Sequence, residues 1–225
     1  MNELVFLAHI AWVSLASYWS RSQSYAAMVM LMVAFSLLGN LMVFKQMLLF
    51  GLTVTTADVY TVGVILVLNF IREQFDDQHV YQAMKYSFIA LALLSLAAYT
   101  QLAYQAVDGD VFQASYQVLL EKMPGLVLKS ACVYWVVQYI DNKFFVWLSD
   151  VFNQNYLLAR ITLSLIFSQF LDTWLFSVWA LEDIAYSLWD IILFSSMVKI
   201  ICSLLMMSNT WLYATLSKCL GRDNV

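Results

Sequence analysis

The sequence has few charged residues for its length, and this shortage excludes an ordinary water-soluble domain. Lys, Arg, Asp and Glu make up 12% of the 225 residues, while 63% are hydrophobic. Soluble domains typically carry about 25% charged residues, so this chain lacks the charge needed to cover a water-facing surface. Apolar stretches of about 20 residues recur instead, each long enough to cross the hydrocarbon core of a bilayer as a helix. The composition therefore predicts an all-α, polytopic bundle of transmembrane helices.

Other absences narrow the kind of function. The net charge of −4 and the lack of a basic cluster argue against nucleic-acid binding. The three cysteines show no metal-ligand spacing, and we predict neither a metal nor a cofactor. The sequence has no His-Glu-x-x-His motif, no Gly-x-Ser-x-Gly motif and no glycine-rich phosphate loop, so we expect no enzymatic activity. With six glycines and one proline, helix interruptions are expected only at Gly39-Asn40, Gly51 and Pro124-Gly125.

Hydropathy predicts six to seven spans within one domain that covers residues 1–225. The first span, 3–19, lacks a basic leader and is expected to be a membrane helix and not a removed signal peptide. Residues 45–54 are apolar but too short to span, and Gly51 interrupts them, so we expect a bent extension or a re-entrant segment. The remaining predicted spans are 25–44, 55–71, 86–107, 126–148, 157–180 and 186–214.

Basic residues in the loops predict how the chain is oriented in the membrane. With seven spans, one side receives only Lys45 and Lys122, together with several acids. The other side receives Arg21, Arg72, Lys85, Lys143, Arg160, Lys218 and Arg222. The more basic side is expected to be cytoplasmic, which places the N-terminus outside and the C-terminus inside a bacterial inner membrane. Because every loop is short, the protein is expected to act within or across the bilayer, by transport, membrane enzymology or assembly with other membrane proteins.

Polar side chains recur inside the predicted spans, although an ionisable group there costs about 2.5–3.5 kcal/mol to insert. Gln138 and Asp141 are three residues apart and therefore share one face of a helix. Gln169 and Asp172 repeat this pattern in the next span. The other polar residues within the spans are Asn40, Asp58, Asn69, Asp190 and Lys199, and Asn69 shares a face with Glu73.

Three interpretations of these polar residues are open. They could hold helices together, at about 0.6 kcal/mol for each hydrogen bond. Asp141 and Asp172 could instead form an internal ion-pair network with Lys199. The third interpretation, a binding cavity, is the one we favour, because contacts between helices do not require ionisable groups.

Several sequence blocks resemble the queuosine-precursor transporter family, also called YhhQ-like vitamin uptake transporters. The two most specific blocks are YWVVQYIDNKFF and RITLSLIFSQFLDTWLF, which match the Tyr-x3-Gln-x2-Asp helix and the Ser-Gln-x2-Asp-Thr-x2-Phe helix of the family. The others are GNLMVFKQMLLFGLTVTTADVY, LVLNFIREQFDD and MVKIICSLLMMSNTWLY. Together they cover residues 35–215, so the domain consists of a family-like core over about 25–215 and an extra N-terminal span.

The chain departs from the family pattern at three places. Asn69 stands where the family usually has an acid, Asp76 stands where it has a glycine, and Asp58 stands where Asn or Gly is common. These departures leave the fold analogy intact and bear on which substrate is taken. They bear equally on how transport is coupled.

The resemblance implies import of a 7-deazaguanine base for tRNA modification: 7-cyano-7-deazaguanine, its aminomethyl relative, or queuine. A carboxylate can accept both N–H groups of a guanine edge, and an amide can serve the ring carbonyl. We therefore expect Asp172 or Asp141 to hold the base edge and Lys199 to neutralise the unoccupied acid. The expected substrate-binding residues are Asn40, Asn69, Glu73, Tyr134, Gln138, Asp141, Gln169, Asp172 and Lys199.

Two other classes of function are compatible with the sequence. The chain could be the substrate-capture subunit of a larger, energised uptake complex, although no obligatory protein partner is evident, and a homo-oligomer is also compatible with the sequence. It could also be a membrane enzyme that uses Asp141 and Asp172 as acid and base. The expected partners are otherwise a purine-like small molecule and the lipid bilayer.

Overall fold

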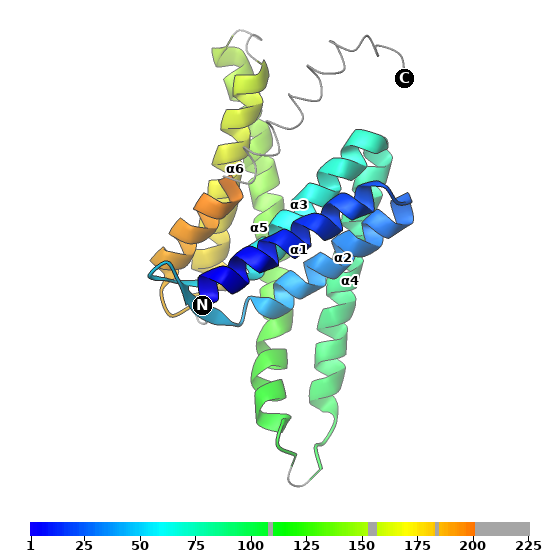
Figure 1. Cartoon of the computed structure of the whole chain (residues 1–225), viewed down its shortest axis with the longest axis vertical. Coiled ribbons are helices and arrows are strands. Elements are labelled where there is room, and N and C mark those ends of the chain that lie inside the picture. Colours follow the sequence, from blue (N-terminus) through cyan, green and yellow to red (C-terminus); the bar gives the residue numbers. More distant parts are fainter. Residues whose placement is uncertain (108–109, 153–156, 183–184, 201–225) are drawn as a thin grey trace.

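The chain folds into seven helices and one β-hairpin within residues 1–107, 110–152, 157–182 and 185–200, the part that our computed structural model describes. The helices are α1 (Asn2–Arg21), α2 (Tyr25–Met42), α3 (Ala57–Gln74), α4 (Asp77–Ala103), α5 (Gln113–Val151), α6 (Leu157–Ala180) and a further helical stretch at residues 188–200. Figure 1 shows α1, α2 and α3 lying side by side, with α4 and α5 extending together beyond them. The mostly helical fold agrees with the all-α prediction.

Two helices in the described residues are long and apolar enough to cross a bilayer by themselves. They are Tyr25–Met42 and the stretch Gln78–Ala103 within α4, while Ala57–Ile71 in α3 is apolar but shorter. Core helices of soluble proteins can share this length and apolar composition. The number of six to seven spans therefore stays a prediction, as does the orientation of the chain. The end of the last predicted span, 201–214, lies outside the described residues.

Residues 46–55 form a β-hairpin and not a bent extension of α2, while the re-entrant position of this segment stays a prediction. Strand β1 (Gln46–Leu49) pairs with β2 (Leu52–Thr55) in antiparallel register, with Leu49 opposite Leu52. Phe50 and Gly51 connect them with φ values of 50° and 82°. Positive φ at both central residues is what a two-residue hairpin turn of this kind requires. A small strand pair therefore stands between α2 and α3.

Two of the three expected helix interruptions are absent. Helix α2 continues through Gly39 and Asn40, and α5 continues through Pro124 and Gly125. An internal proline disfavours a helix by about 3 kcal/mol, but Met123 and Leu126 on either side of Pro124 are both buried. Packing of the flanking residues therefore keeps α5 continuous across Pro124. The helix begins at Gln113, well before residue 126, the predicted start of this span.

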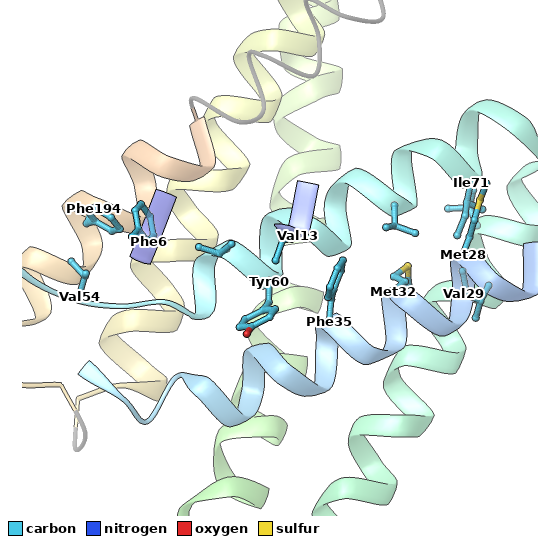
Figure 2. Packing of buried hydrophobic residues seen from close by; sticks show 14 of the residues in the cluster. Phe6, Val13, Met28, Val29, Met32, Phe35, Val54, Tyr60, Ile71 and Phe194 are labelled. Atoms are coloured by element: carbon cyan, nitrogen blue, oxygen red, sulfur yellow. The ribbon is translucent and has the colours of Figure 1, made fainter. Parts of the chain in front are cut away.

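The main core lies between α1, α2, α3 and the hairpin (Figure 2). Phe35 of α2, Val13 of α1 and Tyr60 of α3 belong to this cluster. The three helices approach closely at Gly63 of α3, where an added Cβ would lie 2.7 Å from Val13 Cγ1 and 2.8 Å from Phe35 Cδ2. A small residue is required there for the helices to pack as they do.

Side chains in the loops set the starts of two helices. Ser24 Oγ accepts a hydrogen bond from the backbone of Ala27 at the start of α2. Asp76 caps α4 by accepting from the backbone N–H of His79, and its carboxylate also lies 2.6 Å from His79 Nδ1. The hydrogen bonds from His79 lower the pKa of Asp76. These caps satisfy N–H groups that have no partner inside the helix.

Candidate functional site

An ion pair with a buried lysine joins α6 to the helical stretch at residues 188–200. Lys199 Nζ, from the helical stretch at 188–200, lies 2.9 Å from Asp172 Oδ2 of α6. The Lys199 side chain is 7% exposed, and that of Asp172 is 33% exposed. A buried lysine needs a partner to offset the cost of removing its charge from water. Here the partner is an acid that still reaches the outside of the protein.

A second carboxylate, that of Asp58, lies within range of the charges of this ion pair. Asp58 is in the first turn of α3, is 7% exposed, and accepts a hydrogen bond from Ser195 Oγ. The charges of Lys199 and Asp172 both act on it, and its own charge acts on Lys199. We call Asp58, Asp172, Ser195 and Lys199 the charged cluster. Its members come from α3, α6 and the stretch 188–200.

The hairpin and the loop after α6 hold this cluster in place. The backbone N–H of Thr53 in β2 donates to Asp190 Oδ2 over 2.9 Å, and the N–H of Tyr186 donates to Gln46 Oε1 of β1 over 2.7 Å. Phe194, next to Ser195, contacts Phe6 of α1 with ring centroids 5.5 Å apart. These contacts fix the stretch 188–200 against the start of α3, and so bring Ser195 to Asp58.

Asp141 of α5 has a different partner from Asp172. Ser164 Oγ of α6 donates to Asp141 Oδ1 over 2.5 Å, and Asp141 is half-buried. A neutral hydroxyl donates one hydrogen bond, which leaves this carboxylate further positions at which to accept N–H groups. The two acids of the repeated Gln-x-x-Asp pattern therefore do not share one partner.

Helices α5 and α6 pack side by side and run in opposite directions (Figure 1). Arg160 donates to Ser149 over 2.6 Å, and the hydrogen bond between Ser164 and Asp141 continues the same register. In this register, position 138 of α5 and Gln169 of α6 lie at the same level along the helix axes, to within about one helical turn. Asp141 and Asp172 then lie on opposite sides of this level, roughly 9 Å apart along the helix axes at a rise of about 1.5 Å per residue.

The remaining predicted site residues near this level have distinct surroundings. Gln169 is half-buried on α6, whereas the side chain of Gln138 is outside the described residues. Tyr134 Oη donates to Met84 Sδ of α4 over 3.6 Å, and its ring lies 5.4 Å from that of Phe88. Tyr134 therefore packs between α4 and α5, close along the helix axis to Asp172 in the register above.

Two predicted residues, Asn69 and Glu73, lie along α3 away from the charged cluster, and Asn40 makes its hydrogen bond within its own helix. Asn40 Nδ2 donates to the carbonyl of Ser36 in its own helix, near the α2–α3 contact. Asn69 follows Asp58 by 11 positions in α3, which corresponds to roughly 16 Å along the axis. Glu73 is one turn further, and its side chain is outside the described residues. The structure thus does not bring Asn69 and the α3 position of Glu73 next to Lys199.

Asp58 is the residue that the sequence analysis did not include in the site. It was recognised as a polar residue in an apolar span, but nothing within its own helix pointed to Lys199. The spacing of Ser195 and Lys199, four residues apart and thus on one face, is the signal that could have been used. That face needs a partner that accepts a hydrogen bond from the serine and balances the lysine.

Comparison with known protein families matches residues 55–214 to a family described as "Putative vitamin uptake transporter". The matched range contains every predicted site residue except Asn40, and it contains the whole charged cluster. No curated protein and no solved structure matches this chain.

Proposed function

The chain belongs to the vitamin uptake transporter family, and from this premise we propose that it imports a queuosine precursor, a 7-deazaguanine base, across the bacterial inner membrane. Membership of a transporter family supports a membrane location and favours transport over catalysis. The identity of the substrate is the more specific part of the proposal. It rests on the resemblance of the two Gln-x-x-Asp helices to those of queuosine-precursor transporters.

The observation that carries the proposal is the Lys199–Asp172 ion pair with Asp141 one helix away. Transport proteins bind polar substrates within the bilayer at ionisable residues, which are too costly to be kept there for packing alone. A fixed lysine beside a partly exposed acid is suited to such a site. The lysine balances the acid when no substrate is bound, and the exposed part of the carboxylate remains available to a ligand.

In the proposed mechanism, Asp141 accepts the ring N–H and the exocyclic amine of the base. Charge-assisted hydrogen bonds of this bidentate kind are about twice as strong as neutral ones. Gln169 and Gln138 serve the ring carbonyl, and Tyr134 contributes an aromatic face. Asp172 with Lys199 receives the substituent at the 7-position, at the other end of the flat base.

We also propose substrate contacts outside this binding pose, at Asn40, Asn69 and Glu73. Asn69 and Glu73 lie toward the far end of α3 from Asp58. These two residues would contact the substrate elsewhere along its path through the protein, and not while it is bound at Asp172. Alternating access would expose such residues at a different stage of the cycle.

The experiment is complementation of queuosine-modified tRNA in a bacterial host that lacks its own carrier and cannot make the precursors. The host receives each candidate base in turn, with and without this chain. We expect modified tRNA to appear at low external base only when the chain is expressed. Equal modification without the chain would contradict the proposal, and co-purification of an ATPase required for uptake would instead favour the capture-subunit alternative.

A further inference from the structure

The charged cluster contains two carboxylates and one ammonium group. If Asp58, Asp172 and Lys199 are all ionised, the cluster carries one net negative charge. Asp58 is 7% and Lys199 6% exposed, and a buried charge is costly unless an opposite charge pairs with it. Lys199 contacts Asp172 directly, while Asp58 accepts its hydrogen bond from the neutral hydroxyl of Ser195. In this fully ionised state the cluster is one positive charge short.

The elements packed around Asp58 do not supply this charge within the described residues. The charged groups whose fields act on Asp58 are Lys199 and Asp172. Helix α2 and both strands carry no acidic or basic side chain. On α1 the ring of His9 contacts that of Tyr60, with centroids 4.6 Å apart, and no α1 side chain is among the charges that act on Asp58. Asp190, on the same helical stretch as Lys199, is a further acid and accepts a hydrogen bond from the backbone N–H of Thr53.

One oxygen of Asp172 is left for a ligand. Lys199 contacts Oδ2, and a third of the Asp172 side chain is exposed, whereas Lys199 and Asp58 are buried. A cation that arrives from outside therefore meets Asp172 first. Lys199 has a long flexible stem with a compact charge at its end, so it can shift toward Asp58 when another cation takes Asp172.

On the basis of the transport function above, we propose that this site selects 7-deazaguanine bases whose 7-substituent carries an ammonium group over bases with a neutral nitrile. The ammonium group of the substrate pairs with Asp172, and Lys199 then pairs with Asp58. Every charge in the loaded site has an opposite partner, and the loaded cluster is neutral. A nitrile base leaves one carboxylate without a counter-charge.

The test is uptake of labelled 7-aminomethyl-7-deazaguanine and labelled 7-cyano-7-deazaguanine, each measured separately in proteoliposomes that contain the full chain. We expect a half-saturating concentration at least about tenfold lower for the amine, which corresponds to about 1.4 kcal/mol. Asp58→Asn makes the cluster neutral without substrate and leaves Lys199 without a carboxylate once the amine occupies Asp172, so the preference for the amine should be lost. Asp150→Asn removes an exposed acid of α5 outside the cluster and should leave the tenfold ratio unchanged.

A wild-type protein that takes the nitrile as well as or better than the amine overturns the proposal. Retention of the tenfold preference by Asp58→Asn, or its loss in Asp150→Asn, overturns the assignment to this cluster. If the wild type transports neither base, the transport function itself fails and this inference fails with it. If Asp58→Asn does not insert, the wild-type ratio alone decides.

Discussion

Lys199 Nζ and Asp172 Oδ2 lie 2.9 Å apart and join α6 to the helical stretch at residues 188–200. The lysine is buried, while the acid is partly exposed. This asymmetry gives the pair two separate roles. The lysine pairs directly with Asp172 and interacts through its charge with Asp58, and the exposed side of Asp172 is left to meet a ligand.

Lys199→Met should destabilise the protein and abolish uptake. The change leaves Asp58 and Asp172 without their cation, and removal of one partner from a buried ion pair is more costly than removal of both. We expect a loss of about 1–3 kcal/mol, since Asp172 reaches solvent in part. The measurement is the thermal midpoint of the purified protein in detergent.

The double variant Asp172→Asn with Lys199→Met separates stability from transport. It should recover part of the lost thermal midpoint but none of the uptake. Lys143→Met, at an exposed lysine of α5 that lies over the Tyr139 ring, is the control and should resemble the wild type. A single Lys199→Met variant as stable and active as this control would contradict the role given to the lysine.

Asp141→Asn should raise the half-saturating concentration for the base about 10- to 100-fold. A hydrogen bond to a charged group contributes about 1.5–3 kcal/mol, and an amide cannot accept two N–H groups as a carboxylate does. Uptake of labelled base over a concentration series measures the effect. Asp150→Asn, at an exposed acid on the same helix, is the matched control. An unchanged half-saturating concentration in Asp141→Asn would exclude that acid as the base-edge contact.

Gly63→Ala should lower stability by about 1–3 kcal/mol, the usual cost of overpacking a core. Its Cβ would be 2.7 Å from Val13 and 2.8 Å from Phe35. Gly125→Ala is the comparison, because a Cβ there meets no atom within 4 Å, and Ala is favoured over Gly in a helix by up to about 1 kcal/mol. Thermal midpoints of the two variants should move in opposite directions. Equal midpoints would contradict the close approach of α1, α2 and α3.

The start of α4 should lose stability in acid. Hydrogen bonds from His79 lower the pKa of Asp76 below its ordinary value of 3.8. A lowered pKa in the folded state means that the stabilisation is present above the ordinary value and is lost as the pH falls through the folded value. Hydrogen exchange of the first α4 amides, followed from pH 5 downward, should therefore accelerate below about pH 4.

Asp76→Asn is the control for this titration. Asparagine keeps an N-cap acceptor but does not titrate, so the additional acid-dependent loss at α4 should disappear. An identical acid response in the wild type and in this variant would show that the Asp76 carboxylate is not its source.

The helices could be predicted from sequence because apolar side chains predominate along them, and that signal is local. The caps at Ser24 and Asp76 are of the residue types that favour helix starts. The hairpin could not be predicted in the same way. Its turn depends on a positive φ at Phe50, a residue type that seldom adopts that conformation, and its strands are only four residues each.

Within the candidate site, contacts on one helix could be predicted and contacts between helices could not. The shared faces of Gln138 with Asp141 and of Gln169 with Asp172 follow from helical periodicity. The pairing of Asp58 with Ser195 depends on how the hairpin holds the stretch 188–200 against α3, through Thr53 and Asp190. No spacing rule along the chain encodes that docking. The antiparallel register of α5 and α6 likewise decides which acid takes which partner.

The most direct test of the account is counterflow of labelled 7-deazaguanine base in proteoliposomes that contain the purified chain, because it requires substrate binding and translocation but no driving gradient. We predict that liposomes preloaded with unlabelled base accumulate label through the wild-type protein, and that Asp172→Asn reduces the initial rate at least about tenfold. Wild-type liposomes that take up no more label than empty liposomes, or Asp172→Asn liposomes that match the wild type, would contradict it.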